Sequence, residues 1–600
     1  MRFAHYIKPN ARTETPTNLI FVDTETRPDE VVGKRERHVL WFGWALHIRR
    51  RDNGKVEWEH EEWKRFARAR DFWDFVESVM RPKTKTYIFA HNWNFDGSIL
   101  FTTTELERRH FKSIQYINEK PPFILRVQKA KATLALIDTM NYFTTSLADL
   151  GESIGIAKLT MPTQDKTKQE WDEYCQRDVA VLKRAMLTYM DFIRTEDLGD
   201  FRPTLASQSF NAFRHRFMKH KIFIHTDEDI CALERAAYFG GRVECFRLGE
   251  YREPLYYLDV NSLYPSVMAA EQYPINLRRR GHFLSLKELD KLLTKQAVIA
   301  RVQLDTDEPC YPIRYRGRLT FPVGQFETTL ASPELKYALS KNHITKVSRF
   351  AVYDTGDIFG GFVTTLYQAR RAYSGGGNPA FAYLCKILLN SLYGKFGQSG
   401  KRWENGGITS DPNGTEWFEQ ETPESPIRKF RVRAGLQQEL VHVGESSESF
   451  PAIAAHVTAF GRLLLWKLIL KAGRGNVYYT DTDSLVCTQA GFDNLQDEID
   501  PVELGKLKIE SVNTSMVIWG AKDYRLDDIE KHKGIRKTAT QLSIDTWEQA
   551  RFFSWDWHLS QEQEGFIYIE QIRKTLHRDY RKGIPTESGI VLPITLGGVE

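Results

Sequence analysis

Asp481 and Asp483 stand two positions apart between two short apolar runs, Val477–Tyr479 and Leu485–Cys487. The runs are rich in β-branched and aromatic residues, so the segment is predicted to form a β-hairpin with both carboxylates at its tip. Neighbouring carboxylates repel each other, and a fold that presents such a pair usually holds a cation; hard oxygen ligands suit Mg²⁺ or Mn²⁺. Short acidic turns are also common on solvated surfaces, so the hairpin indicates a metal site only if other residues support it.

A third carboxylate can join this pair. Asp259 ends an apolar strand predicted over Leu255–Val260, and a turn follows it. The backbone amides of residues 262–264 are free to donate to phosphate oxygens. The sequence therefore predicts a metal cluster of Asp259, Asp481 and Asp483 beside a phosphate-binding turn.

A helix predicted over Ala380–Phe396 carries a polar stripe. Lys386, Asn390 and Tyr393 fall at i, i+4 and i+7, hence on one face of that helix. A lysine, an amide and an aromatic ring in line suit a triphosphate, a sugar and a base. A lysine on an amphipathic helix is usually only solvated, and the stripe alone does not decide between the two interpretations.

A second group of side chains that could bind metal lies in the first 200 residues: Asp23, Glu25, Asp96, Tyr174 and Asp178. The first two stand two residues apart at the end of a strand predicted over 19–22, so they share a face. The third follows a strand predicted over 86–90, and the last two share a face of a helix predicted over 171–194. Each acid taken singly is best explained as an ordinary surface or strand-end residue. Together, four carboxylates and a hydroxyl could hold two divalent ions and orient water for phosphodiester hydrolysis.

The composition indicates a globular protein with several domains. The chain has 600 residues, which is too long for one core. Of these residues 42% are hydrophobic and 12% aromatic, which supports a well-packed globular protein. Its net charge of +5 is mildly basic and does not by itself identify a nucleic-acid partner. The six cysteines are scattered without a CxxC pair, which argues against a zinc site and a disulfide framework and for a reducing compartment. We find no signal-like N-terminus and no run that approaches membrane-spanning length, so a soluble, intracellular protein without a membrane partner is expected.

The order of elements divides the chain. Residues 19–190 alternate strands and helices, and residues 191–206 form a plausible boundary before a second α/β region. Residues 397–450 are polar and interrupted by glycine and proline, so they are predicted to be a loop-rich or β-rich insertion.

These segments resemble the motifs of family B DNA polymerases. Residues 258–266 are similar to motif A, residues 386–394 to motif B and residues 479–484 to motif C. The N-terminal carboxylates match, in order, the three exonuclease motifs of the DEDD family in its tyrosine-bearing version. The resemblance covers roughly residues 19–540. It implies an RNase H-like DEDD exonuclease domain followed by a right-hand polymerase domain of palm, fingers and thumb, an α/β and α+β multidomain fold.

The resemblance also implies roles for the carboxylates. In the exonuclease domain the metal ligands would be Asp23, Glu25, Asp96 and Asp178, with Tyr174 positioning the water. In the polymerase domain Asp259, the Val260 backbone and Asp483 would hold metal, with Asp481 in support. Each site would take two Mg²⁺ or Mn²⁺ ions. Lys158 and Lys166 are both candidates for a lysine that assists the exonuclease site.

Further contacts follow from smaller motifs. The implied nucleotide-binding residues are Val260, Ser262, Leu263, Tyr264, Arg370, Arg371, Lys386, Asn390 and Tyr393, and spacing does not choose between the two arginines. The implied DNA-binding residues are Asn92, Phe95, Tyr238, Gly240, Gly241, Thr458, Arg462, Lys522 and Tyr524. His91 could also contact DNA, although a histidine beside a strand end is as often structural.

Two long intervals resemble the protein-primed branch of the family. There are 127 positions from Asp259 to Lys386 and 65 from Tyr393 to Thr458. In that branch two inserted regions grip a terminal protein and encircle DNA. The implied domains are an exonuclease at 1–195, palm at 196–266, an insertion resembling terminal protein region 1 plus palm at 267–362, fingers at 363–398, an insertion resembling terminal protein region 2 at 399–450, palm at 451–525 and thumb at 526–600.

The expected activity is DNA-templated DNA synthesis with proofreading 3′–5′ exonuclease. The expected partners are template and primer DNA, dNTPs, a terminal protein as primer and a single-stranded DNA-binding protein. A phage, linear plasmid or other mobile element would be the source, with the enzyme in the host cytoplasm. The alternatives are a nucleic-acid-primed or primer-independent family B polymerase, an exonuclease whose polymerase half has decayed, and a non-catalytic replication scaffold. The last two are disfavoured because both carboxylate sets are complete.

Overall fold

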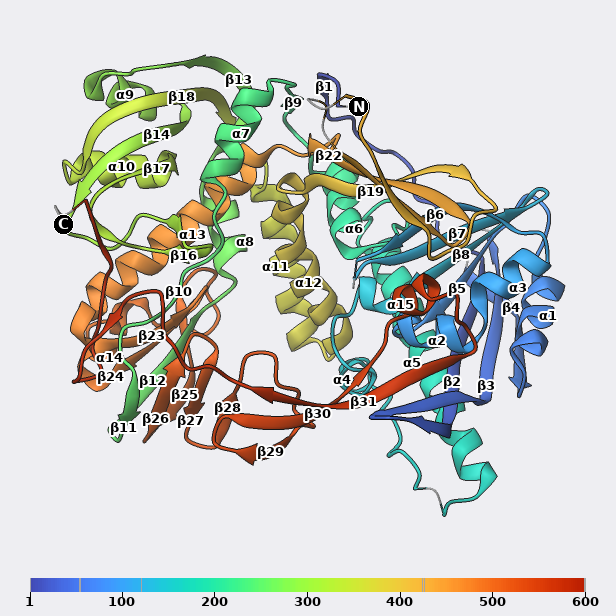
Figure 1. The fold of residues 1–600 in the computed structure, drawn as a ribbon. Helices are drawn as coiled ribbons and strands as arrows, with labels where there is room; N and C mark the ends of the chain where they lie inside the picture. The colour runs from blue at the N-terminus through green and yellow to red at the C-terminus, as the bar shows by residue number, and fades with distance from the viewer. Residues whose placement is uncertain are drawn as a thin grey trace.

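The computed structural model describes residues 2–52, 56–119, 121–163, 165–422, 425 and 427–597. Figure 1 shows an N-terminal lobe in blue and cyan and a second lobe of green, orange and red segments, with the helices α11 (Gly360–Gly375) and α12 (Pro379–Phe396) between them. The architecture is α/β and α+β and has several domains, as the sequence predicts.

The N-terminal lobe is built on a ten-stranded mixed sheet. Its centre consists of parallel strands that alternate with helices, namely β2 (Asn18–Val32), β5 (Lys85–Ala90) and β8 (Ala132–Asp138). Helix α5 (Lys168–Thr195) contacts β2, and their apolar side chains share one core. The helix begins at a capping box in which Thr167 and Glu170 accept from each other's backbone amides. The predicted strands and long helix are confirmed here.

The palm is a five-stranded sheet in the order β10-β23-β24-β12-β25. Its strands are β10 (Val243–Cys245), β12 (Leu255–Val260), β23 (Val477–Asp481), β24 (Ser484–Thr488) and β25 (Leu507–Asn513). Strands β23 and β24 form the predicted hairpin, and β24 pairs antiparallel with β12 so that Asp259 lies opposite Ser484. The sheet therefore brings the two acidic segments, more than 200 residues apart in sequence, to one edge.

Helix α13 (Pro451–Ala472) corrects one expectation from the sequence. Its length of 22 residues and a mean hydropathy of 1.5 are enough to cross a membrane, so a run of spanning length does exist. However, 72% of the apolar window is buried inside the protein, where it packs with α7 (Glu228–Ala237), α10 (Ser332–Ser340) and α12. A helix that is apolar all round is the pattern of a core helix surrounded by other elements.

Both predicted insertions contain a sheet of their own. The first is a five-stranded sheet that includes β13 (Tyr273–Gly281), β14 (Ala297–Thr306), β17 (Val323–Ala331) and β18 (Ile344–Gly356). The second is a four-stranded antiparallel sheet of β19 (Ser399–Ile408), β20 (Glu416–Glu419), β21 (Arg428–Arg433) and β22 (Leu436–Glu445). The β-rich alternative for residues 397–450 is the correct one.

The C-terminal stretch, expected as a thumb at 526–600, is not a self-contained unit. Strands β29 (Thr540–Ser543), β30 (Thr546–Phe552) and β31 (Phe566–Thr575) extend the N-terminal sheet, because β31 pairs with β3 (Arg35–Asp52). Strand β34 (Thr595–Leu596) instead joins β17 of the first insertion. Sequence periodicity identifies strands but not their partners, so this sharing was not foreseen.

Trp555 on α15 (Trp555–Ser560) fastens this stretch to the N-terminal lobe. It is fully buried, packs at the edge of Tyr116 and beside Phe123, and lies so close to Gly97 that a Cβ there would come within 2.7 Å of the indole. We expect Trp555→Ala to destabilise the N-terminal lobe by about 3–5 kcal/mol, the usual cost of removing a buried indole. Denaturant unfolding would measure this loss. The half-buried Trp557 is the matched control, and an equal loss in Trp557→Ala would contradict the assignment.

Candidate active sites

The N-terminal carboxylates come together at the carboxyl end of the central strands. Asp23 and Glu25 lie on β2, Asp96 on the short helix α2 (Trp93–Ile99) and Asp178 on α5. Glu25, Asp96 and Asp178 are each at least nine-tenths buried. Ligand atoms of Asp23 and Glu25 lie within 4.8 Å of each other and of the Cys175 thiol. The predicted cluster is therefore assembled from three separate elements.

Burial and mutual repulsion raise the pKa values of the acids in this cluster. Burial, then the charges of Asp178 and Asp96, raises the pKa of Asp23 well above its usual value. Burial and then Asp178 raise the pKa of Glu25 to about 8, and burial raises that of Asp96 to about 7. One carboxylate oxygen of Asp178 is buried and accepts no hydrogen bond from any described residue. Closely spaced, under-neutralised oxygen ligands fit divalent cations such as Mg²⁺ or Mn²⁺.

Of the two candidate lysines, Lys158 is the one that lies at this cluster. Its ammonium forms an ion pair with Asp178 and lies 4.7 Å from the centre of the Tyr174 ring. Lys166, the other candidate, pairs instead with the exposed Glu170 on the first turn of α5. Tyr174 itself is largely buried against this lysine, on the same face of α5 as Asp178, as predicted.

Two polar residues that support the cluster were missed. Thr24 donates to a carboxylate oxygen of Asp96 at 2.6 Å. Asp138, at the end of β8, accepts from the backbone amides of Asn92 and Trp93 at 2.9 and 2.8 Å, and burial raises its pKa to about 6. It fixes the start of α2, where Asn92 adopts a left-handed φ of 84°. Asp138 could have been predicted to support the cluster from its position at the end of a parallel strand.

The predicted contacts for single-stranded DNA lie beside this cluster. Asn92 and Phe95 are half-buried, and the Phe95 ring packs against Phe552 of the C-terminal strands. His91 uses one ring nitrogen toward the Thr139 hydroxyl at 2.8 Å and the other toward the Thr145 carbonyl at 3.1 Å. The structural alternative for His91 is therefore the better one.

The polymerase carboxylates meet at the palm edge through backbone pairing. The Val260 amide donates to the Asp483 carbonyl at 2.7 Å, which ties the end of β12 to the hairpin tip. Thr482 takes a left-handed φ of 65° at that tip and donates from its amide to the Arg242 carbonyl at 2.7 Å. Burial, then the charge of Asp259, raises the pKa of Asp483 to about 6. The charge of Asp259 therefore acts on Asp483, which is expected of two acids that could share a metal ion.

Lysines balance the remaining charge. Lys508 on β25 lies 3.4 Å from a carboxylate oxygen of Asp259, and this residue was not anticipated. Lys522 and Lys531 lie 3.3 and 4.0 Å from the two oxygens of Asp481. Asp481 is therefore engaged by the C-terminal lysines, which agrees with a supporting role beside Asp259 and Asp483.

The turn after Asp259 faces the helices α11 and α12. Arg370 donates to the Ser262 hydroxyl at 3.2 Å, whereas Arg371 is exposed, with its charge felt by Asp500. The structure thereby chooses Arg370 for the phosphate turn. The side chains of Val260 and Leu263 are buried, so only their backbone atoms are available to a ligand.

The polar stripe on α12 is confirmed. Lys386 and Asn390 are exposed, and the charge of Lys386 is felt by Asp259. The Tyr393 ring lies 4.8 Å from that of Tyr264, between their centres. The Tyr264 ring packs directly against Gly461, where a Cβ would come within 3.1 Å of the ring.

Two predicted DNA contacts are wrong as direct contacts. Arg462 is 3% exposed, pairs with the buried Glu334 at 2.8 Å and donates to the Phe239 and Gly240 carbonyls. Thr458 is also buried, and its hydroxyl donates to helix carbonyls one turn back. Both lie on α13, which is surrounded by protein. Arg462 instead holds the turn of residues 238–241 in place.

The other predicted DNA contacts are divided. Gly240 is exposed, and Tyr238 is half-buried. Gly241 packs under the hairpin tip, where a Cβ would meet Thr482 at 2.6 Å. Lys522 is exposed near Asp481, whereas Tyr524 is 4% exposed and belongs to the palm core. Tyr524 therefore supports the site rather than presenting its ring to a ligand.

The raised pKa values predict a pH dependence of stability. In metal-free protein, folded Glu25 and Asp96 keep protons that the unfolded chain loses near pH 4.5 and 3.8. Stability should therefore fall as pH rises from about 4.5 to about 8, and a divalent cation should flatten this fall. Thermal unfolding with EDTA or Mg²⁺ would measure it. Glu25→Gln should reduce the slope and the exposed Glu170→Gln should not; a midpoint that rises with pH in EDTA would contradict the prediction.

Comparison with known proteins agrees with this geometry. A family model described as DNA polymerase type B, organellar and viral, matches residues 156–404. A probable DNA polymerase of Neurospora intermedia is 26% identical over 375 residues, 60% of this chain and 37% of the fungal protein. The DNA-directed DNA polymerase of Enterobacteria phage PRD1 is 25% identical over 384 residues, 62% of each chain. The chain spans less than two thirds of the length of both relatives.

Among solved structures, phi29 DNA polymerase with primer-template DNA and incoming nucleotides has the same fold. The TM-score is 0.69 at 17% identity, covering 94% of this chain and 100% of that chain. Over residues 156–404 the chain is therefore similar to the organellar and viral type of family B DNA polymerases.

Proposed function

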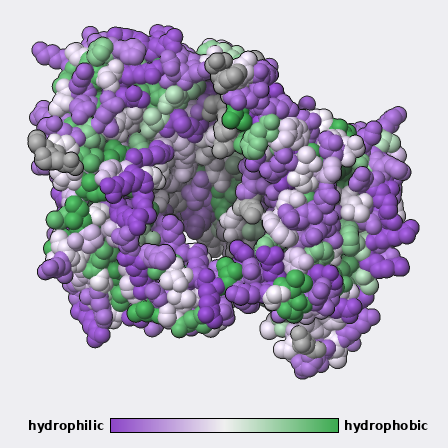
Figure 2. Space-filling view, in the orientation of Figure 1, coloured by the Kyte–Doolittle hydropathy of each residue, from purple (hydrophilic) through white to green (hydrophobic). Residues whose placement is uncertain are grey.

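We propose that this chain is a DNA-templated DNA polymerase with a proofreading 3′–5′ exonuclease. The observation that carries the proposal is the pairing of β12 with β24. It sets Asp259 and Asp483 at one edge of the palm sheet, facing Arg370 on α11 and Lys386 on α12. Figure 2 supports it with a hollow between the lobes whose near rim is largely hydrophilic. Such a surface suits nucleic acid gripped by its phosphates, as synthesis on any sequence requires.

In the polymerase site, the turn amides after Asp259, Arg370 and Lys386 would bind the dNTP triphosphate. Tyr264 and Tyr393 would form a floor under the sugar and base. The primer 3′ oxygen attacks the α-phosphorus, the bond to the β-phosphate breaks, and pyrophosphate leaves. Each site would hold two Mg²⁺ or Mn²⁺ ions. Asp259, Asp483 and the Val260 carbonyl would bind them in the polymerase site, and the four N-terminal carboxylates would bind them in the exonuclease site. The ions would activate the nucleophile and neutralise the leaving group.

In the exonuclease site, Asn92 and Phe95 would hold the frayed 3′ end. Lys158 and Tyr174 lie together beside Asp178 and would orient the attacking water. Water attacks the terminal phosphorus, and the penultimate 3′ oxygen leaves with a proton, releasing one nucleotide. Both carboxylate sets are complete, so an enzyme that synthesises and corrects DNA explains more residues than an exonuclease or a scaffold does.

The two insertions support priming by a terminal protein. Each forms a sheet rather than an unstructured loop. The sheet of the first insertion includes the C-terminal strand β34, and that of the second packs on β6 (Lys112–Asn118) of the N-terminal lobe and on α7. We propose that they grip a terminal protein and enclose DNA during strand displacement on a linear viral or plasmid genome in the host cytoplasm. Priming from a nucleic acid, or without a primer, is the alternative. A single-stranded DNA-binding protein would cover the displaced strand.

Asp483→Ala tests the polymerase assignment. Removing a principal metal ligand should reduce primer extension by at least about 100-fold while 3′–5′ degradation of single-stranded DNA continues. Extension and degradation are followed on one labelled primer with and without dNTPs. The reciprocal variant, Asp23→Ala with Asp96→Ala, should lose degradation and keep extension. Unchanged synthesis in Asp483→Ala would sink the polymerase assignment.

Priming is tested with three templates. Synthesis is measured on a primed template, on an unprimed template, and on an unprimed linear template with the terminal-protein candidate encoded nearby. We expect synthesis on the first and third, with the third product covalently attached to protein and sensitive to protease. A nucleotide product on the bare unprimed template would favour the primer-independent alternative.

A further inference from the structure

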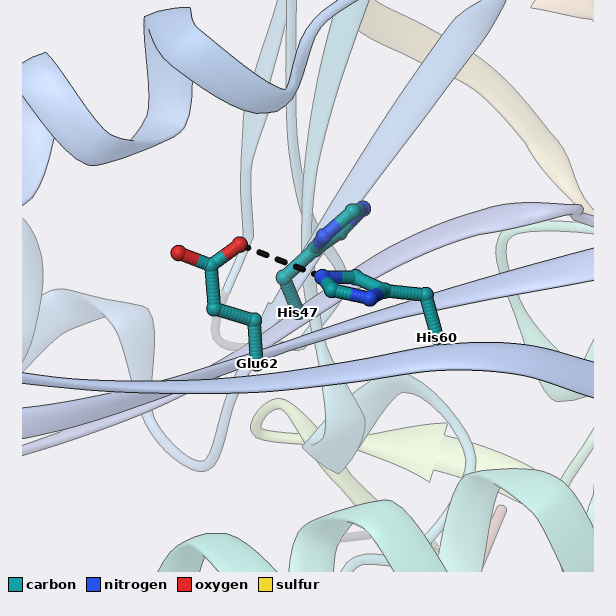
Figure 3. Close-up of side chains that lie close together, drawn as sticks. All are labelled: His47, His60 and Glu62. Carbon is teal, nitrogen blue, oxygen red and sulfur yellow. Dashed lines mark hydrogen bonds and ion pairs between the residues drawn. The ribbon is translucent and has the colours of Figure 1, made fainter.

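A histidine pair and a glutamate gather where strands β3 and β4 of the N-terminal sheet pair, and none of the three belongs to either carboxylate centre. Strands β3 and β4 (Val56–Phe66) pair antiparallel, with His47 directly opposite Glu62 and Arg49 opposite His60. One ligand atom from each of His47, His60 and Glu62 lies within 4.8 Å of the others. Figure 3 shows the three side chains converging from the two strands.

His47 carries a buried lone pair that the described residues leave unused. Its side chain is 4% exposed, and its Nε2 lies 2.7 Å from the Asn18 side-chain oxygen. The orientation of Asn18 is fixed because its amide nitrogen donates to the Thr86 hydroxyl at 2.8 Å and to the Val79 carbonyl at 3.2 Å. An amide oxygen only accepts, so Nε2 must carry the proton and Nδ1 must be the bare nitrogen.

That bare nitrogen has no hydrogen-bond donor among the residues the structure describes. Burial, then the neighbouring His60, lowers the pKa of His47 to about 4, so the ring is neutral at physiological pH. An unsatisfied buried polar atom costs free energy and needs an explanation. A histidine that donates from one nitrogen to an amide oxygen and keeps the other bare is the arrangement of a metal ligand with its orienting partner.

We propose that His47, His60 and Glu62 bind one divalent transition-metal ion of the zinc class. Two imidazoles and a carboxylate form a ligand set that zinc takes and that Mg²⁺, which prefers oxygen, does not. His60 and Glu62 now contact each other at 3.3 Å and are about half exposed, so both can rotate toward the buried nitrogen. A solvent molecule would complete a tetrahedral site.

The ion would fasten an edge strand. Strand β4 pairs only with β3 in the described sheet, and its far end lies under the exonuclease carboxylates, where Phe66 packs against Gly43 next to the Asp23 backbone. Binding would join β4 to β3 and, through Asn18, to β2. The role inferred is therefore structural, and the absence of CxxC pairs, which argued against a zinc site, does not bear on a site made by histidine.

The test is Zn²⁺ titration of the full chain by calorimetry, with excess Mg²⁺ to occupy the two carboxylate centres, and Co²⁺ absorption to report nitrogen ligands. Wild type should bind one ion that His60→Ala and Glu62→Gln each weaken by about 10- to 100-fold. Zn²⁺ should raise the thermal midpoint of wild type but not of these variants.

The matched control is His38→Ala. His38 also lies on β3 and contacts a glutamate two residues away, Glu36, at 3.3 Å, but no third ligand joins them among the described residues. Its Zn²⁺ binding should equal that of wild type. Circular dichroism checks that each variant is folded. Equal Zn²⁺ stoichiometry and affinity in wild type, His60→Ala and Glu62→Gln would overturn the proposal, and so would an equal loss in His38→Ala.

Discussion

The antiparallel pairing of β12 with β24 is the constraint on which the rest of the polymerase site depends. It forces Asp259 and Asp483 to the same edge, where burial and then the charge of Asp259 raise the pKa of Asp483. Surrounding contacts hold this unfavourable arrangement: the Arg242 carbonyl fixes Thr482, and the buried Arg462 fixes the turn below it. The carboxylates are preorganised for cations because the backbone, and not the side chains, determines their separation.

The N-terminal carboxylates are held close together by different elements. These acids come from a strand, a short helix and a long helix, so no single ladder of hydrogen bonds sets their positions. Asp138 and Thr24 take over that task by holding the start of α2 and the Asp96 carboxylate. Lys158 supplies a local positive charge to Asp178, but burial still keeps the carboxyl pKa values high. In both centres burial and neighbouring acids raise carboxyl pKa values, and a bound cation would lower them.

Much of this could be read from the sequence because period and spacing are local properties. The strand at 255–260, the helix stripe of Lys386, Asn390 and Tyr393, and the acidic hairpin all lie where predicted. What failed depended on tertiary packing. Arg462 and Tyr524 resemble DNA contacts in short motifs, yet both are buried, and nothing in a tripeptide reveals what packs over it. Lys508 was missed because its role comes from strand register, and the choice of Arg370 over Arg371 required the helix orientation.

The pairing of the C-terminal strands with the N-terminal sheet has a consequence for dividing the chain into separate domains. Since β31 lies on β3, the first and last parts of the chain close a loop through one continuous sheet. Cutting the chain after residue 195 would not liberate an intact editing module, because its sheet would lose three strands and expose an open edge prone to association. The two lobes are thus joined through one sheet, and a change in the angle between them must bend or slide that sheet.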